Sequence, residues 1–377
     1  NAPLPWRAKK FNLLIASYLF YAAWSPPFVI LLWISTAVDW KVAQWIYKSE
    51  SQSHRRFFLA LSLATNLGIL GYFKYGGFLL ENFQALASSV GFDYQPVDWN
   101  IVLPVGISFY TFQTMAYSLD VYLKRSAPAK SLLDFSLFVT FFPQLVAGPI
   151  VRPSQLVPQF AEPKRATSPQ LIWGLGLMTS GLFEKIVLAD SFLAPAADGA
   201  FGHDGALAPL DAWTGVLAFS GQIFFDFSGY STIAIGAALC LGFALPNNFR
   251  FPYAAIGFSD FWRRWHISLS TWLRDYLYIP IGGSKKGPIR TYINLSITML
   301  LGGLWHGASW TFVVWGGLHG LYLAGERILR EVVPEQKWFA GWPFKFAMAL
   351  LTYFLVNITW VFFRAQSFGE ARTMLGS

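Results

Sequence analysis

The stretch TYINLSITMLLGGLWHGASWTFVVWGGLHGLYLAG, Thr291–Gly325, decides the fold class because its 35 residues include no Lys, Arg, Asp or Glu. One helical membrane crossing needs about 20 apolar residues, so this stretch is long enough for more than one crossing. Gly302, Gly303 and Gly307 lie close to His306, and glycines let a backbone bend or be approached closely. An ionisable side chain in membrane-embedded sequence is costly and is a candidate functional group by default. The sequence therefore predicts a functional group at His306.

Composition places the whole chain in the membrane class. Hydrophobic residues make up 54% of the 377 residues and charged residues 13%, and the mean hydropathy is +0.42. Soluble domains carry about 25% charged residues. The sequence has 17 Trp and 16 Tyr, and these numbers suit a membrane protein, because the amphipathic rings of both residues are enriched at the two membrane interfaces. The net charge of +8 would suggest nucleic-acid binding in a soluble protein, but basic cytoplasmic loops explain it in a membrane protein.

Long apolar segments recur along the chain and predict an all-α polytopic membrane protein with about nine to twelve transmembrane helices. No repeat or long linker interrupts them, so we expect a single membrane-embedded domain over residues 1–377. Its ends look cut short on both sides. Trp213–Leu245 is too long for one crossing and contains Asp226 and Gly229, so we expect a break or a helical hairpin there. The other apolar segments are Phe11–Trp24, Phe28–Tyr47, Phe57–Leu80, Ile101–Leu123, Leu132–Ile150, Leu171–Leu188 and Phe344–Phe363.

The charge of the loops gives an orientation. Arg250–Arg290 holds seven basic and two acidic residues, a local charge of +5 without histidine. Cytoplasmic loops of membrane proteins are enriched in Lys and Arg, so this loop is expected on the cytoplasmic side.

Common catalytic and metal motifs are absent from the sequence. It has no G-x-S-x-G, H-E-x-x-H, G-x-x-x-x-G-K-[ST] or C-x-x-C, and its single cysteine, Cys240, lies in an apolar run. A histidine set remains. His266 follows Arg263 and Arg264 in an aromatic segment that would place Trp262, Trp265 and Leu269 on one stripe of a helix. This segment is expected to be interfacial or re-entrant, and a snorkelling amphipathic helix without a chemical role is the alternative.

His306 also has two possible roles. A histidine in such sequence is often only a packed, hydrogen-bonded side chain, but the nearby glycines leave room for a substrate. Burial favours the neutral imidazole, which can accept a proton. If one helix continued through the stretch, His319 would point away from His306, so a two-histidine metal site is not expected. Asp226 is surrounded by aromatic residues and needs a partner for its carboxylate. The simplest interpretation is a structural ion pair with an Arg that holds the fold together.

The chain resembles the membrane-bound O-acyltransferase family over nearly its whole length. It is most similar to the bacterial branch that acts in alginate O-acetylation, and more distantly to the members that transfer D-alanine to teichoic acid. One departure is Thr232, which stands where the alginate-type pattern usually has Asp. The motifs that carry the resemblance are FWRRWHISLSTWLRDYLYIPIGGSKKG (Phe261–Gly287), LLGGLWHGASWTFVVWGGLHG (Leu300–Gly320), FFDFSGYSTIAIG (Phe224–Gly236), LPVGISFYTFQTMAYSLDVY (Leu103–Tyr122) and FFPQLVAGPIVRPSQL (Phe141–Leu156).

The resemblance implies a ring of helices around a central tunnel, with re-entrant or interfacial helices. It implies that His306 is the essential histidine and His266 the second functional one, both catalytic. We expect no bound cofactor and no metal; acetyl-CoA or an acyl carrier is the expected donor. Residues expected to contact donor or substrate are Arg263, Arg264, Trp305, Lys285, Lys286 and Asp226.

These expectations add up to a multi-pass acetyltransferase of the bacterial inner membrane. It would move acetyl groups from a cytoplasmic donor toward an exported polysaccharide, alginate-like or of the cell wall, together with a periplasmic O-acetyltransferase partner. Two alternatives stay open: a transporter or flippase of an acylated intermediate, and a family member that transfers D-alanyl or longer acyl groups.

Overall fold

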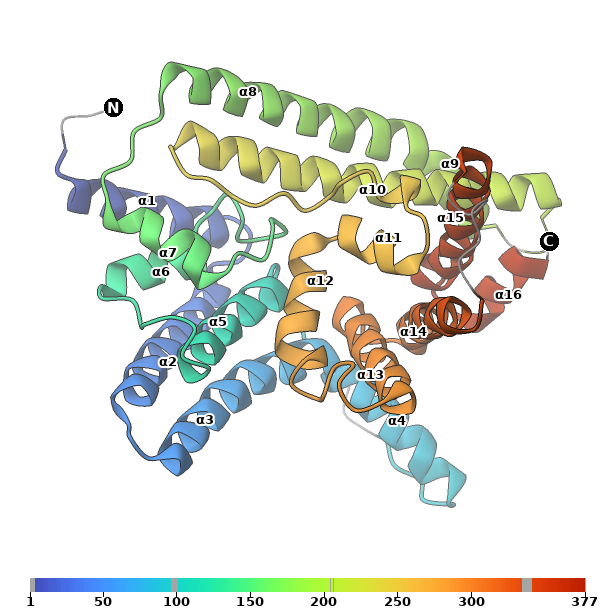
Figure 1. Cartoon of the computed structure of the whole chain (residues 1–377), viewed down its shortest axis with the longest axis horizontal. Helices are drawn as coiled ribbons and strands as arrows, with labels where there is room; N and C mark the ends of the chain where they lie inside the picture. The colour runs from blue at the N-terminus through green and yellow to red at the C-terminus, as the bar shows by residue number, and fades with distance from the viewer. Residues whose placement is uncertain (1–3, 96–100, 204, 206, 334–340, 377) are drawn as a thin grey trace. The chain divides into compact units, whose positions relative to one another are not determined.

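The computed structural model describes residues 4–95, 101–203, 205, 207–333 and 341–376 (Figure 1). Every regular element in these ranges is a helix, which confirms the helical class. Two compact units divide the chain: Asn1–Leu175 with Ala234–Leu245, and Gly176–Ile233 with Pro246–Ser377. The single domain over 1–377, cut short at both ends, stays a prediction.

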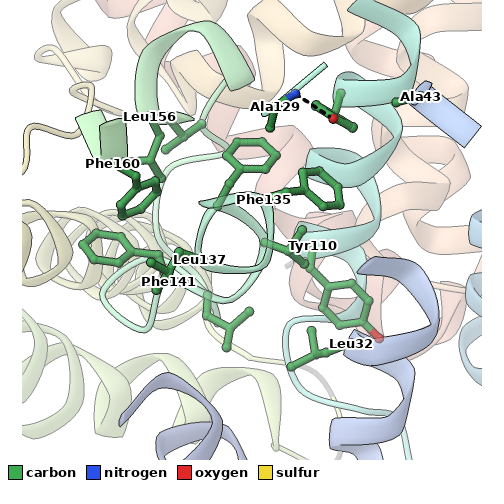
Figure 2. Packing of buried hydrophobic residues seen from close by; sticks show 14 of the residues in the cluster. Leu32, Ala43, Tyr110, Ala129, Phe135, Leu137, Phe141, Leu156 and Phe160 are labelled. Atoms are coloured by element: carbon green, nitrogen blue, oxygen red, sulfur yellow. Dashed lines mark hydrogen bonds between the residues drawn. The ribbon is translucent and has the colours of Figure 1, made fainter. Parts of the chain in front are cut away.

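The first unit is a set of helices around a buried aromatic core. Phe135 and Phe141 are fully buried in it (Figure 2), as is Phe138. The Tyr117 hydroxyl accepts a hydrogen bond from the Ala129 backbone N–H at 3.0 Å. Its elements are α1 (Trp6–Ala22), η1 (Pro26–Phe28), α2 (Val29–Lys48), α3 (Gln52–Leu70), η2 (Gly71–Tyr75), α4 (Gly76–Ser89), α5 (Ile107–Tyr122), α6 (Leu132–Thr140), α7 (Pro153–Ala161) and the start of α8 (Ser168–Leu182).

A buried carboxylate ties α2, α3 and α5 together inside this unit. Asp39 is fully buried and accepts hydrogen bonds from Asn66 Nδ2 at 2.7 Å, from Ser118 Oγ at 2.5 Å and from Ser62 Oγ. A buried polar group is tolerated when its hydrogen bonds are made. The donors come from two other helices, so the cluster fixes how the three pack.

The second unit carries the histidines. Its helices are the end of α8, η3 (Phe183–Leu193), α9 (Ala194–Phe201), α10 (Pro209–Cys240), η4 (Pro252–Ala254), α11 (Phe258–Arg264), α12 (Ile267–Leu273), η5 (Arg274–Tyr278), α13 (Pro288–His306), α14 (Trp310–Val332), α15 (Trp342–Arg364) and α16 (Phe368–Gly376). The last residues of α10 belong to the first unit.

Five helical segments among the described residues are long and apolar enough to cross a membrane, which supports the polytopic class. The total of nine to twelve transmembrane helices and their arrangement as a ring around a tunnel stay predictions. The five segments are Pro26–Lys48, Gln52–Ser89, Ser168–Phe201, Pro209–Cys240 and Trp342–Arg364.

The expected break within Trp213–Leu245 is wrong, because α10 runs unbroken over 32 residues. Gly229 serves a close approach instead of a bend. A Cβ at Gly229 would lie 2.7 Å from the Gly181 carbonyl oxygen, and one at Gly181 would lie 2.5 Å from the Gly229 carbonyl oxygen. Both distances are too short for real atoms, so the glycine pair lets two helices pack backbone against backbone.

Candidate active site

His306 is the last residue of α13, at a sharp junction with α14. Gly307 follows in an extended conformation, and Ser309 caps α14 by accepting a hydrogen bond from the Thr311 N–H at 3.3 Å. A serine in this position satisfies one of the free N–H groups at a helix start. The prediction that glycines near His306 permit a bend is confirmed at Gly307. Because α13 ends at His306 and α14 begins at Trp310, the expectation that His319 points away from His306, which assumed one continuous helix, does not apply.

A seam of glycines fixes the angle between α13 and α14. A Cβ at Gly303 would lie 2.2 Å from the Phe312 carbonyl oxygen, and a Cβ at Gly316 would lie 2.2 Å from the Met299 carbonyl oxygen. Only glycine lets two backbones come this close. The seam therefore places His306, three residues after Gly303, at a fixed position beside α14.

His266 lies at an equally sharp junction, between α11 and α12. Its backbone is left-handed, with φ 42° and ψ 54°, and its side chain is fully buried. This conformation costs a non-glycine residue on the order of 1–3 kcal/mol and is found where the surroundings impose it. The single helix that would place Trp262, Trp265 and Leu269 on one stripe is therefore wrong. The chain turns at His266 and buries all three residues.

Asn248 holds this turn in place. Its backbone carbonyl accepts a hydrogen bond from the Ile267 N–H at 2.9 Å, and its Oδ1 accepts from the Ser268 N–H at 3.1 Å and from Ser268 Oγ at 2.9 Å. Its Nδ2 donates to Ser231 Oγ on α10 at 3.3 Å. The buried amide therefore binds the residues directly after His266. Sequence reasoning missed it, and the only signal was a pair of Asn residues, Asn247 and Asn248, in the irregular segment after α10.

We expect Asn248→Ala to lower both stability and activity. It removes the acceptor of the Ser268 N–H and Oγ hydrogen bonds and the donor to Ser231 Oγ, which costs about 1–3 kcal/mol, and it frees the strained His266 turn. Acyl-transfer activity should fall about tenfold. Asn247→Ala is the matched control, because Asn247 is exposed and should stay within about 0.5 kcal/mol of wild type. The measurements are the thermal unfolding midpoint in detergent and the turnover of the purified protein. Equal behaviour of the two variants would contradict this role of Asn248.

The two junctions bring the two imidazoles together. The ring centroids of His266 and His306 lie 6.2 Å apart, and Trp305 packs against both rings, at 5.8 Å from His266 and 5.0 Å from His306. Trp315 and Phe363 pack edge-on against His306 at 5.0 and 5.3 Å. His306 therefore sits among three aromatic rings with a second imidazole beside it. Apolar surroundings of this kind strengthen electrostatic effects on a reacting group.

Burial sets the protonation of His266. This residue lies between two seven-residue helices, which are too short to cross a membrane. Burial lowers the pKa of its imidazole well below the ordinary value, and His306 acts in the same direction. His266 is therefore neutral, and a neutral imidazole can donate one hydrogen bond and accept another.

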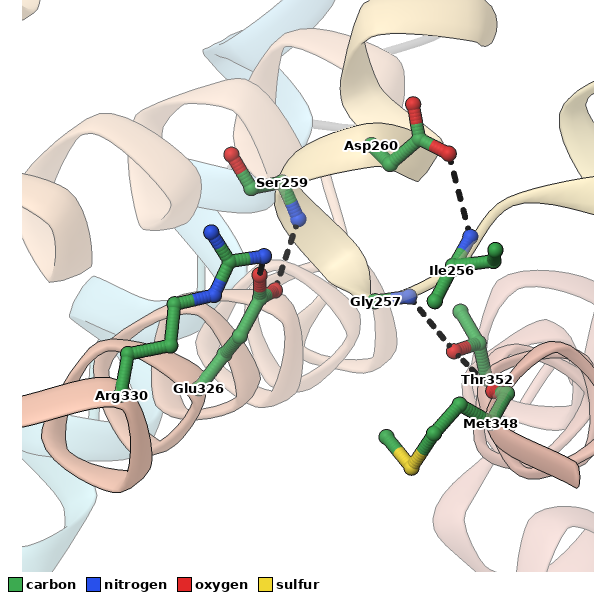
Figure 3. Close-up of polar contacts among 8 residues, drawn as sticks. All are labelled: Ile256, Gly257, Ser259, Asp260, Glu326, Arg330, Met348 and Thr352. Carbon is green, nitrogen blue, oxygen red and sulfur yellow. Dashed lines mark hydrogen bonds and ion pairs between the residues drawn. The ribbon is translucent and has the colours of Figure 1, made fainter. Parts of the chain in front are cut away.

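The start of α11 is held by side chains from α14 and α15 (Figure 3). Glu326 of α14 accepts a hydrogen bond from the Ser259 N–H at 2.9 Å and pairs with Arg330. Thr352 of α15 accepts from the Gly257 N–H at 2.9 Å. Free N–H groups at a helix start favour a negative partner, so the Glu326 carboxylate fits this place. These contacts fix the helix that leads to His266.

The predicted donor-binding cations do not lie on one continuous loop. Arg263 and Arg264 are in the last turn of α11, where Arg264 Nε pairs with Asp260 Oδ1 at 2.9 Å. Lys285 and Lys286 are exposed in the turn before α13. The 19 residues of α13 extend about 28 Å, so these lysines flank the end of the helix opposite His306. The Arg250–Arg290 stretch is a loop only in part, because the helices in its middle are packed into the core.

Asp226 is not part of the imidazole cluster. Its Oδ1 pairs with Lys185 Nζ at 2.5 Å, and the same Nζ contacts Asp190 Oδ1 at 2.8 Å. The expected structural partner was an Arg, and this is wrong: a lysine from η3 takes the place. With this partner Asp226 joins η3 to α10, and a substrate role for it stays a prediction.

His319 packs behind the site. Its Nε2 lies 3.0 Å from Thr359 Oγ1, and its ring packs edge-on against Trp315 at 4.8 Å. Trp315 in turn contacts His306, so His319 supports a wall of the site. Among the described residues, no group of three or more His, Cys, Asp or Glu could hold a metal ion.

Sequence comparisons identify the family. The model of the membrane-bound O-acyltransferase family matches residues 24–366. The chain belongs to this family. It is an acyltransferase, and it works at a lipid bilayer with an acyl donor.

Two relatives align over almost the whole chain and a third over part of it. The probable alginate O-acetylase of Azotobacter vinelandii is 43% identical over 98% of this chain and 72% of its own length. The peptidoglycan O-acetyltransferase of Helicobacter pylori is 38% identical over 97% of this chain and 73% of its own length. The teichoic acid D-alanyltransferase of Bacillus subtilis is 29% identical over 63% of this chain and 62% of its own length.

Proposed function

We propose that this acyltransferase moves acetyl groups from a cytoplasmic thioester donor, acetyl-CoA or an acyl carrier, toward an exported polysaccharide. The two relatives with the longer alignments are named for the O-acetylation of polymers that lie outside the cytoplasm, alginate and peptidoglycan. A multi-pass protein of the bacterial inner membrane has access to both the donor and the exported polymer. The juxtaposition of His306 and His266 is the single observation that carries the chemistry.

His306 is proposed as the general base. Its imidazole takes the proton of an acceptor hydroxyl while the hydroxyl oxygen attacks the thioester carbonyl. When the carbon–sulfur bond breaks, the imidazolium returns the proton to the leaving thiolate. General acid–base catalysis of this kind contributes about 10²–10⁴ in rate. His266, buried and neutral beside it, is proposed to hydrogen-bond the acceptor or the carbonyl oxygen.

Trp305 is proposed to form the wall against which the acyl group lies, since its ring packs against both imidazoles. The turn at Lys285 and Lys286 is proposed to bind donor phosphates. These lysines are exposed, and ammonium groups attract phosphates. Because α13 extends about 28 Å from this turn to His306, a donor with a long flexible arm fits better than a compact one. Both acetyl-CoA and an acyl carrier present the thioester on such an arm.

Replacing both lysines with glutamine should raise the apparent KM for the donor about five- to tenfold and leave kcat near wild type. The lost interaction is an attraction between surface charges, which salt screens. The difference in KM between the glutamine variant and wild type should therefore shrink toward about 1 M salt, where the Debye length is only about 3 Å. The double variant with arginine keeps the charge and is the control. If the glutamine variant has an unchanged KM at low salt, the turn does not bind the donor.

The side of the membrane can be tested at Ser284, in the same turn. A cysteine placed there, in a chain with Cys240→Ser, should react with an impermeant maleimide only in inverted vesicles. Reaction in intact cells would place the turn outside and would contradict a cytoplasmic donor site.

A periplasmic O-acetyltransferase is proposed to receive the acetyl group and complete its transfer to sugar. This chain would then deliver the acyl group through the bilayer, and the partner would select the polymer. Co-purification of the two proteins, with loss of polymer acetylation when either gene is absent, is the expected result.

Mass spectrometry of the exopolysaccharide and of the cell wall tests the substrate. Cells that lack the protein should lose O-acetyl esters from one of these polymers and regain them when the chain is restored. Loss of D-alanyl esters instead would favour the function of the Bacillus subtilis relative. Unchanged ester content in every polymer would contradict the proposal.

A further inference from the structure

A groove of about 510 Å³ runs along the first half of α15, apart from the imidazole cluster. One wall is α15 and the other is the segment around η4. The lining is almost entirely apolar or aromatic, with one cation at its end. The residues of α15 that line it are Lys345, Phe346, Ala349, Leu350 and Tyr353, and those opposite are Tyr253, Ala254 and Ile256.

The groove is directed along the membrane-spanning helix. Lys345 lies in the first turn of α15, next to Trp342, whose side chain is 77% exposed as at a membrane interface. Tyr353 is eight residues further along, about 12 Å deeper. The groove therefore begins at a charged mouth and descends beside an apolar helix.

The far wall is fixed, so the groove is built into the fold. The Gly257 N–H donates to Thr352 Oγ1 at 2.9 Å, which attaches the segment after η4 to α15 (Figure 3). The Tyr253 hydroxyl donates to the Ser220 carbonyl at 2.6 Å, and the Tyr253 ring contacts Tyr353 at 5.0 Å. Since the Tyr253 hydroxyl already has its partner, Tyr253 contributes its ring to the deep end of the groove, beside the ring of Tyr353.

We propose that this groove binds one anionic phospholipid. An acyl chain would lie along Phe346, Ala349 and Leu350, and the phosphate would meet the Lys345 ammonium, which has no ion pair with another described residue. The Trp342 ring would lie at the level of the headgroup. Charge complementarity selects an anionic headgroup: a cation close to a membrane surface contributes about 1 kcal/mol to binding of acidic lipid, close to a fivefold preference.

Native mass spectrometry of the purified full chain tests the proposal directly. The protein is exchanged into nanodiscs of phosphatidylglycerol or of phosphatidylcholine with the same acyl chains, and the retained lipids are counted after release. Wild type should retain one more phosphatidylglycerol than phosphatidylcholine. Lys345→Gln should weaken this retention about fivefold, and Lys345→Arg should restore it.

The chain offers a matched steric control on the same helix. Ala349 lines the groove and Ala347 is exposed outside it, so Ala349→Phe should displace the lipid whereas Ala347→Phe should not. Because Lys345 is exposed, Lys345→Gln should fold normally even if Ala349→Phe does not. Equal retention of the two lipids, or no effect of Lys345→Gln, would overturn the proposal. The readout is lipid binding, so its failure would leave the acyl-transfer function untouched.

Discussion

His306→Ala is expected to abolish acyl transfer while the protein still folds and inserts. Removing the general base costs about 10²–10⁴ in rate, so polymer acetylation in cells that carry only the variant should fall below about a hundredth of wild type. The imidazole is only partly buried at the end of α13, and the glycine seam that holds the hairpin does not depend on it. Protein level and thermal unfolding midpoint should therefore change little.

His203→Ala is the control for this variant, because His203 is exposed after the end of α9. It should support acetylation at the wild-type level. If His306→Ala keeps more than a tenth of wild-type activity at equal protein level, His306 is not the general base. A variant that fails to accumulate would give it a structural role instead.

Gly316→Ala is expected to disrupt the α13–α14 hairpin and to remove activity with it. The new methyl group would lie 2.2 Å from the Met299 carbonyl oxygen, and a backbone atom cannot move away without shifting α13. Overpacking of this kind costs about 1–3 kcal/mol or more, and the shift would carry His306 away from His266. The measurements are the unfolding midpoint in detergent and acyl transfer per folded molecule.

Gly317→Ala provides the matched comparison one residue further along. A Cβ there meets only Leu300 Cδ2 at 3.5 Å, an ordinary contact. Alanine is better than glycine inside a helix by about 1 kcal/mol, so this variant should be neutral or slightly more stable. If the two variants behave alike, the close approach at Gly316 does not set the hairpin angle.

The sequence predicts the features that depend on composition and local pattern. The uncharged run Thr291–Gly325 predicts apolar helices, and its glycines near an imidazole predict a close or bent backbone; the structure has α13 and α14 there, with the chain turning at Gly307. Neither helix is among the five described segments that are long and apolar enough to cross a membrane, so the predicted crossings in this stretch stay a prediction. The family motifs add His266. The sequence therefore identifies both histidines as candidates, but it does not predict the 6.2 Å separation of their ring centroids.

Features that depend on tertiary contacts could not be predicted in this way. The left-handed turn at His266 has no local signal, because it is imposed by Asn248, which is 18 residues away in the chain. Gly229 looks like a helix breaker in sequence, but Gly181 from another helix determines its use. The partner of Asp226 was wrong for the same reason: Lys185 is a neighbour only in the folded chain.

Transfer of an isotope-labelled acetyl group in inverted membrane vesicles tests the central claim most directly. The donor thioester is supplied on the exposed cytoplasmic side, and acetyl esters on acceptors inside the vesicles are measured by mass spectrometry. Vesicles with the wild-type chain and its acceptors should accumulate labelled esters inside, whereas vesicles with His306→Ala at the same protein level should accumulate almost none. Equal labelling with wild type and His306→Ala, or equal labelling without the chain, would contradict acyl transfer at the His306–His266 site.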